Sequence, residues 1–281
     1  MTLIYQDDLI QSVADALQFI SYYHPLDFIK AINEAYEKEE SEPAKGAMAQ
    51  ILINSRMSAM GHRPLCQDTG IVTVFVKVGM SVSWKGATMS VSDMINEGVR
   101  RAYTHPDNLL RASILDDPDG ARRNTKDNTP AVIHYEIVEG NTVDVQLAAK
   151  GGGSENKSKM VMLNPSDSIV DWVVETIPTM GAGWCPPGML GIGIGGTAEK
   201  AAIMAKEALM GPIDIHELRS VGPQTRAEEL RLEIFQAVNN LGIGAQGLGG
   251  LTTVLDVKVK DYPTHAASKP VVMIPNCAAT R

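Results

Sequence analysis

The sequence has few cysteines, few aromatic residues and no excess of basic residues. Of its 281 residues three are cysteine and 5% are aromatic, and the formal net charge is -8. Three cysteines cannot all pair with one another, so they indicate free thiols, catalysis or metal binding in place of a disulfide framework. An acidic chain lacks the basic surface that releases counterions from a phosphate backbone, and we therefore expect no nucleic-acid partner.

Long apolar runs are also missing. No run approaches the roughly twenty apolar residues that a membrane helix needs. The first residues, MTLIYQDDLIQ, contain neither the basic nor the apolar region of a signal peptide. We therefore expect a cytoplasmic protein with no membrane partner. The remaining composition is that of an ordinary globular protein, with 44% apolar and 21% charged residues.

Hydrophobic periodicity predicts a mixed α/β fold. Spacing typical of amphipathic helices occurs in the regions 9–20, 28–36, 43–61, 167–179, 197–210 and 227–241. Segments typical of strands are 71–78, 131–138, 143–149, 189–194, 252–260 and 271–274. The turn residues 139–141 predict a hairpin between the second and third of these strands. Because no linker or repeat interrupts the chain, we expect a single domain over residues 1–281, with sheets surrounded by helices.

Each cysteine lies in a loop next to a predicted strand. Cys66 is within PLCQDTG at 64–70, Cys185 within WCPPG at 184–188, and Cys277 directly follows the last predicted strand. Loops at strand ends are where functional sites are commonly built. The cysteines are too far apart in sequence for a local zinc knuckle or ferredoxin motif. Any metal that they share must therefore be assembled by the fold.

Three thiolates from three distant loops can hold three corners of a [4Fe–4S] cluster and leave the fourth iron without a protein ligand. Such an iron is an open Lewis acid. It suits a 2-hydroxy acid as substrate, because hydroxide is a poor leaving group and polarisation of the C–O bond lowers that barrier. The weakly acidic proton next to the distal carboxylate then requires a positioned base.

Six motifs of the sequence resemble class I fumarate hydratase. They are PLCQDTG at 64–70, KGGGSENKS at 150–158, WCPPGMLGIGIGG at 184–196, LGIGAQGLGG at 241–250, PTHAASKP at 263–270 and PNCAATR at 275–281. The resemblance covers nearly the whole chain from residue 60 onward. It is specific, since the three cysteine motifs occur in the family's order with the glycine-rich motifs between them.

The resemblance implies an iron–sulfur hydro-lyase that interconverts fumarate and L-malate. The implied ligands of its [4Fe–4S] cluster are Cys66, Cys185 and Cys277. Gln67 and Asp68 are implied to act at the dicarboxylate substrate, with Asp68 in proton transfer, and Arg111 to bind a carboxylate group. In the family a C-terminal domain or β subunit supplies further substrate-binding groups, so we expect such a partner, and a homo-oligomer, namely a dimer.

Two further motifs contain candidate residues. The run Gly151, Gly152 and Gly153 lets backbone N–H groups approach a bound carboxylate closely, and it is also typical of a flexible loop. His265 is the only one of six histidines that lies in a family motif. It is a candidate for donating to a carboxylate or assisting proton transfer, and the alternative is an exposed turn histidine.

Three other functions stay open. L(+)-tartrate dehydratase is an enzyme of similar two-part architecture, although KGGGSENKS favours fumarate hydratase. Gly191, Gly193 and Gly196 match the glycine pattern of NAD-binding oxidoreductases, with Asp214 near the position of their ribose-binding acid. These glycines fit close packing of a helix on a strand better than they fit NAD. A non-catalytic iron sensor would bind a cluster whose spectrum does not respond to malate.

Overall fold

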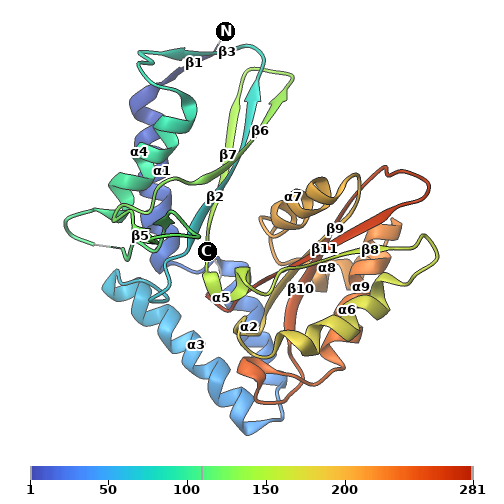
Figure 1. Ribbon diagram of the computed structural model, residues 1–281. Helices are drawn as coiled ribbons and strands as arrows, with labels where there is room; N and C mark the ends of the chain where they lie inside the picture. The colour runs from blue at the N-terminus through green and yellow to red at the C-terminus, as the bar shows by residue number, and fades with distance from the viewer. Residues whose placement is uncertain (1, 109, 280–281) are drawn as a thin grey trace. The chain divides into compact units, whose positions relative to one another are not determined.

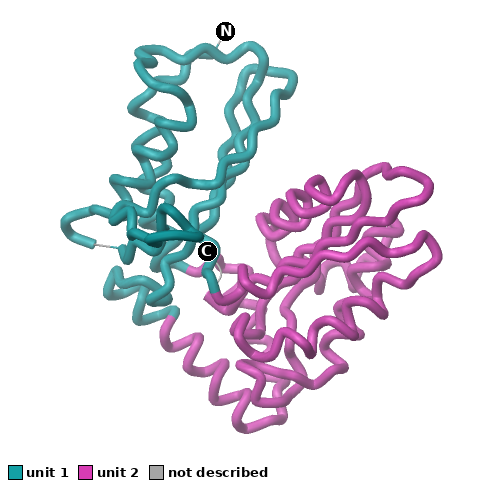
Figure 2. Tube along the Cα trace, in the orientation of Figure 1, with its two compact units in different colours: residues 1–23, 55–152, 281 teal, residues 24–54, 153–280 magenta. Residues whose placement is uncertain are grey.

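The computed structural model describes residues 2–108 and 110–279 and confirms the mixed α/β fold, with several sheets among helices (Figure 1). The described residues form two compact units (Figure 2): unit 1 contains residues 2–23 and 55–152, and unit 2 contains residues 24–54 and 153–279. Composition alone did not predict this division, because one boundary falls inside the helix α3 (Glu42–Gly61) and another between two glycines. Within the described residues, no helix has both the length and the apolar character needed to cross a membrane.

Unit 1 is built on a three-stranded sheet whose one face packs against two helices. Its strands, in spatial order, are β6 (Val132–Val138), β2 (Ile71–Gly79) and β7 (Val143–Lys150), and its helices are α1 (Gln6–Tyr22) and α4 (Val91–Tyr103). The core between them includes Leu17, Val74 and Ile95. Two small sheets pair β1 (Thr2–Tyr5) with β3 (Val82–Lys85) and β4 (Leu115–Asp116) with β5 (Arg123–Asn124).

The predicted hairpin of β6 and β7 is wrong, because β2 lies between these strands. Val74 of β2 pairs with Ile133 in parallel and with Leu147 in antiparallel orientation. At the end of β2, the Met80 N–H donates to the Val138 carbonyl oxygen at 2.9 Å. Turn residues report only local chain reversal. The insertion of β2 follows from burial of its residues 72–76, which need a neighbour on both edges.

Unit 2 contains a four-stranded mixed sheet with helices on both faces. Its strands, in spatial order, are β10 (Val254–Tyr262), β9 (Gly188–Gly195), β11 (Lys269–Asn276) and β8 (Lys159–Leu163). The helices described in full within this unit are α2 (Leu26–Lys38), α6 (Ile169–Thr176), α7 (Ala198–Ala208), α8 (Ile215–Val221) and α9 (Arg226–Asn239), with 3-10 turns η1 (Ile177–Met180) and η2 (Ala245–Gly247). Alternate strand residues such as Ile192 and Met273 share a core with α6 and α9, and Met189 and Val272 share one with α7.

Glycines in β9 allow α7 to lie close to the sheet. A Cβ atom at Gly193 would be 1.9 Å from the Ala201 carbonyl oxygen, and one at Gly191 would be 2.1 Å from the Ala205 carbonyl oxygen. No side chain fits at such distances. These two glycines are therefore required for helix–strand packing, as the sequence analysis favoured over a nucleotide site.

Candidate active site

The first cysteine loop connects α3 to β2 in unit 1. The Leu65 N–H donates to the Ser21 carbonyl oxygen at 2.8 Å, and the Tyr103 hydroxyl donates to the Thr69 carbonyl oxygen at 2.6 Å. Leu65 and Thr69 are buried, whereas Cys66 is half-buried and Gln67 is exposed. The loop is thus fixed at both ends, and its central residues Cys66 to Asp68 remain accessible.

The Asp68 carboxylate links this loop to the glycine motif. One oxygen accepts the Gly70 N–H at 3.0 Å and the other accepts the Gly152 N–H at 2.7 Å. Gly70 has a φ of +82°, and a Cβ there would lie 2.7 Å from the Ala149 backbone, so glycine is needed for this approach. The Gly152 N–H therefore orients a carboxylate of the protein itself. Gly152 and Gly153 open the short helix α5 (Gly152–Glu155), and neither is in the flexible loop that glycine runs often form.

Arg111 lies beside the first cysteine loop. The Thr69 hydroxyl donates to the Arg111 carbonyl oxygen, and the Arg111 side chain is exposed. Asn128, which is fully buried, donates to the Gly70 carbonyl oxygen at 3.0 Å and accepts the Ser113 N–H at 2.8 Å. The structure thus brings the predicted residues Gln67, Asp68 and Arg111 together in unit 1, with Asn128 as a bridge that the sequence did not indicate.

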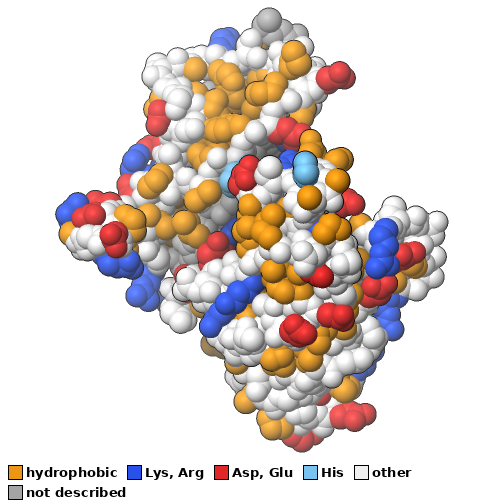
Figure 3. Space-filling model, turned by 45° about the vertical axis from the view of Figure 1, so that its right-hand side comes forward, with side chains coloured by type: hydrophobic (Ala, Val, Ile, Leu, Met, Phe, Trp, Pro, Cys, Tyr) orange, Lys and Arg blue, Asp and Glu red, His pale blue; other side chains and the backbone are white. Residues whose placement is uncertain are grey.

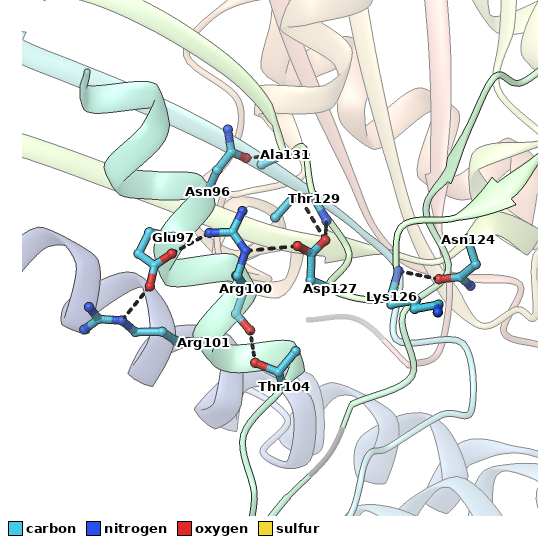
Figure 4. A network of polar contacts seen from close by, with 10 residues as sticks. All are labelled: Asn96, Glu97, Arg100, Arg101, Thr104, Asn124, Lys126, Asp127, Thr129 and Ala131. Carbon is cyan, nitrogen blue, oxygen red and sulfur yellow. Dashed lines mark hydrogen bonds and ion pairs between the residues drawn. The ribbon is translucent and has the colours of Figure 1, made fainter. Parts of the chain in front are cut away.

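A charged network holds the segment that contains Asn128 (Figure 4). Arg100 of α4 donates to Asp127 at 3.0 Å and also pairs with Glu97, while Asp127 accepts from the Thr129 hydroxyl at 2.8 Å. Burial raises the pKa of the Asp127 carboxyl, but its hydrogen bonds from Thr129 and Arg100 outweigh that effect and the net pKa is lowered. The network fixes α4 to residues 127–129 and so supports the Asn128 bridge.

Cys185 and Cys277 lie in neighbouring loops of unit 2. The Ala278 N–H donates to the Cys185 carbonyl oxygen at 3.0 Å. Their strands are also adjacent, since Asn276 at the end of β11 pairs with Met189 near the start of β9. Cys185 is exposed and Cys277 is half-buried, and neither is in a disulfide. The fold thus brings together two of the three predicted thiol ligands.

The second half of the KGGGSENKS motif lies against the segment before Cys185. A Cβ at Gly153 would be 3.0 Å from the Gly183 carbonyl oxygen, and one at Gly183 would be 3.1 Å from the Lys157 side chain. Lys157 therefore runs beside the loop that contains Trp184 and Cys185. The motif contributes to the surroundings of Asp68 in unit 1 and of Cys185 in unit 2.

His265 belongs to unit 2, as Cys185 and Cys277 do, but it does not lie near Cys185. His265 follows β10, whose last residue Tyr262 pairs with Gly195 at the far end of β9 from Cys185. β9 has eight residues and so separates its two ends by on the order of 20 Å. His265 is exposed in a turn, where its Nδ1 accepts the Ala267 N–H at 3.1 Å. The exposed-turn alternative describes its position in this chain.

Asp214, the acid that the nucleotide pattern requires, forms ion pairs within the protein. Its carboxylate accepts from Lys258 at 2.6 Å and also pairs with Arg231, and both cations contact the fully buried Asp256. Together with the packing of α7 on Gly191 and Gly193, this argues against a ribose-binding role. The NAD alternative is not supported.

The three thiols suit an iron–sulfur cluster in their chemistry. None is in a disulfide, and thiolate sulfur is the usual protein ligand of such clusters. Within residues 2–108 and 110–279, no group of three or more His, Cys, Asp or Glu side chains lies close enough together to hold a metal ion. The fit of the three loops to a cluster thus rests on the donor type and the accessibility of their thiols.

Comparison with known proteins identifies the family. The family model described as "Fumarate hydratase (Fumerase)" matches residues 10–281. This chain belongs to that family. A Fumerase-family relative from Methanocaldococcus jannaschii, described as "Putative L(+)-tartrate dehydratase subunit alpha", is 37% identical over 96% of this chain and 94% of its own length. The L(+)-tartrate dehydratase subunit alpha of Escherichia coli is 29% identical over 97% of this chain and 88% of its own length. The family model is thus described as a hydratase and the two relatives as dehydratase subunits, and both descriptions denote hydro-lyases.

Proposed function

We propose that this chain is the α subunit of a hydro-lyase that dehydrates L(+)-tartrate. The observation that carries the choice of substrate is that both relatives, at 37% and 29% identity over nearly their whole length, are described as tartrate dehydratase α subunits. This differs from the fumarate preference that the motif KGGGSENKS suggested. Removal of water from tartrate yields oxaloacetate, so the reaction breaks one C–O and one C–H bond.

Cys66, Cys185 and Cys277 are proposed as the ligands of a [4Fe–4S] cluster. When bound, the cluster supplies an iron without a protein ligand, which acts as a Lewis acid toward the substrate hydroxyl. The accessibility of all three thiols and the bond between the second and third cysteine loops support this assignment.

Asp68 is proposed to transfer the proton at the carbon next to the substrate carboxylate. Backbone N–H groups of Gly70 and Gly152 hold its two oxygens in a fixed orientation, which is what proton transfer at a defined atom requires. Gln67 and Arg111 are proposed to bind the carboxylates, since both residues are exposed and the Arg111 backbone is bonded to Thr69, the residue after Asp68. Gly151 and Gly153 are proposed as further backbone contacts. His265 is kept as a proposed proton-transfer residue, although its turn lies at the far end of β9 from Cys185.

A second candidate is hydration of fumarate to L-malate. It is favoured by the description of the family model and by the motif at 150–158. Malate lacks one hydroxyl of tartrate and is otherwise the same four-carbon dicarboxylate. The same residues would therefore serve both substrates, and discrimination would depend on the group at the extra hydroxyl.

We also propose a β subunit or C-terminal domain as partner, and a homo-oligomer. The relatives are described as α subunits, which implies a second subunit in those enzymes. Figure 3 shows hydrophobic side chains on the surface of both units, and among the exposed ones are Ile137 at 68%, Leu26 at 84% and Met60 at 76%. Such exposure supports a chain that is covered by other subunits.

The test is to reconstitute the chain anaerobically with iron and sulfide, add the β partner, and compare kcat/KM for L(+)-tartrate, L-malate and fumarate. We expect formation of oxaloacetate from tartrate to be the most efficient reaction. A higher kcat/KM for malate or fumarate would favour the second candidate. Cys66→Ala, Cys185→Ala and Cys277→Ala are each expected to lose the complete cluster, and retention of full iron, sulfide and turnover in any one would reject that ligand.

A further inference from the structure

Gln246 lies in the loop between α9 and β10 and contacts the residue after Cys185. Its backbone N–H donates to the Pro186 carbonyl oxygen at 2.6 Å, and its side-chain Nε2 donates to the same oxygen at 2.7 Å. Gln246 adopts left-handed backbone angles, with a φ of +54°, which is uncommon for a residue with a Cβ. One residue thus directs two donors at a single carbonyl group, and it does so from a disfavoured conformation.

A buried glutamate holds one end of this loop. Glu39, only 3% exposed, accepts the Leu251 N–H at 2.9 Å and 3.2 Å with its two oxygens. It also accepts the backbone N–H groups of Glu40 and Ser41, each at 3.0 Å. A Cβ at Gly250 would lie 2.7 Å from a Glu39 oxygen. Because a buried carboxylate must be hydrogen-bonded, Glu39 and the loop fix each other in place.

Asn239, which precedes the loop, is bonded to the residues at its end. The Asn239 side-chain oxygen accepts the Thr253 N–H at 2.7 Å and the Val254 N–H at 3.0 Å. The Thr253 hydroxyl, fully buried, accepts the Gly244 N–H at 3.1 Å. The loop is therefore a rigid support and Gln246 has a defined position within unit 2.

The Cys185 loop is held by further backbone bonds. Cys185 is itself left-handed, with a φ of +56°, and its N–H donates to the Ala182 carbonyl oxygen at 2.9 Å. Its own carbonyl oxygen accepts the Ala278 N–H from the third cysteine loop. Gln246 restrains the next carbonyl group, that of Pro186. Restraints therefore lie on both sides of the Cys185 side chain.

We propose that Gln246 is a positioning residue for Cys185, and through the Cys185–Ala278 bond for Cys277, with Glu39 as the anchor of its loop. The proposal rests on the proposed function in one respect, namely that these two cysteines hold the cluster. It predicts that loss of the Gln246 amide loosens both cysteine loops and weakens retention of iron.

The first test measures hydrogen exchange in the full chain without iron. Gln246→Glu keeps the size of the side chain and removes its donor, and Gln246→Asn keeps an amide that is too short to reach Pro186. Gln236→Glu, the same change at an exposed glutamine of α9, is the control. We expect the Cys185 and Ala278 amides to exchange about fivefold faster in both Gln246 variants and unchanged in the control, the size expected for one hydrogen bond. Glu39→Gln should act in the same direction.

The second test measures iron release from anaerobically reconstituted chain to a chelator. The Gln246 variants should release iron about fivefold faster than wild type and the Gln236 control at the wild-type rate. Unchanged exchange, or faster exchange with an unchanged release rate, overturns the proposal. A wild-type chain that takes up no iron refutes the proposed function, and the exchange data then decide alone whether Gln246 holds the Cys185 loop. If the circular dichroism spectrum of Gln246→Glu differs from that of wild type, this variant is misfolded, and the exchange and iron-release rates of Gln246→Asn decide whether the proposal holds.

Discussion

Asp68 has the most constrained surroundings of the predicted catalytic side chains. Its two oxygens accept N–H groups from residues 82 positions apart, Gly70 and Gly152. Thr69 and Gly70, the two residues that follow Asp68, are buried, so the backbone next to this carboxylate is held in place. This argues for a role of Asp68 in which the orientation of its carboxylate matters as well as its charge.

Asp68→Asn is expected to keep the cluster and lower kcat by about a hundredfold or more, because it removes a positioned proton acceptor while keeping the side-chain size. The measurement is kcat at saturating substrate, together with iron and sulfide per chain. Asp144→Asn, at an exposed position on β7, is the matched control and should leave both unchanged. A normal kcat with a full cluster would contradict the role of Asp68.

Arg111→Met should mainly weaken substrate binding. Arg111 is exposed and its backbone carbonyl oxygen accepts the Thr69 hydroxyl of the first cysteine loop, and loss of a charge-assisted carboxylate contact is expected to raise KM by about tenfold. Initial rates over a range of tartrate concentrations measure this. Arg123→Met, at a surface pair with Asp116, is the control. A reduced kcat with an unaltered KM would show that Arg111 does not act in binding.

At the scale of elements, the contact of α7 with β9 requires glycine in β9, because any side chain there would clash with α7. Gly193→Ala would place a Cβ 1.9 Å from the Ala201 carbonyl oxygen, so α7 must shift, and we expect the free energy of unfolding to fall by about 1–3 kcal/mol. Gly46→Ala in α3 is the matched control, since nothing lies within 4 Å of its Cβ, and it should raise that free energy by about 0.5–1 kcal/mol. Urea unfolding measures both. Equal stability of the two variants would be inconsistent with this packing.

The ion network that joins α8, α9 and β10 predicts a dependence of stability on pH. Burial raises the pKa of the Asp214 carboxyl, but its bonds to Lys258 and Arg231 outweigh this and the net pKa is lowered. A carboxyl whose pKa is lower in the folded state stabilises the fold above its unfolded pKa of about 3.9, and this contribution disappears as pH falls through the lower folded pKa.

The urea midpoint of the wild-type chain is therefore expected to fall as pH decreases below about 4. Lys258→Met removes one partner, so this variant should be less stable at pH 7 and should lose less on acidification. Lys260→Met, which removes a surface pair with Glu207 on the same strand, is the control. An identical acid dependence in wild type and Lys258→Met would contradict the assignment.

At the scale of the whole molecule, the chain contains all three proposed cluster ligands and only some of the proposed substrate contacts. Alone it should assemble a cluster and show little turnover, because orientation of the substrate beside Asp68 needs further binding groups that the proposed β partner would supply. The measurement is oxaloacetate formation from tartrate before and after addition of the partner in trans. Full activity of the isolated chain would show that its site is complete.

The sequence by itself was sufficient for the local features. Turn residues and hydrophobic periodicity depend only on residues that are close in sequence, and they predicted the cysteine loops and several helices and strands. These are the loops of Cys66, Cys185 and Cys277, the helices near 43–61 and 227–241, and the strands near 71–78 and 189–194. The helix α4 is not among the helices predicted from periodicity, although Ser90 and Asp93 form a capping box at its start, which is a helix signal that the sequence contains.

Only the tertiary structure decided which distant residues meet. Three contacts join segments that are far apart in sequence and that no local pattern relates. They are the pairing of β2 with both β6 and β7, the hydrogen bond from Asn128 to Gly70, and the hydrogen bond from Gln246 to Pro186. His265 lies in one of the motifs that resemble the family, yet the length of β9 separates it from Cys185. The physical reason is that side-chain spacing specifies helices and strands, whereas the pairing of strands and the closing of loops depend on which buried surfaces fit together.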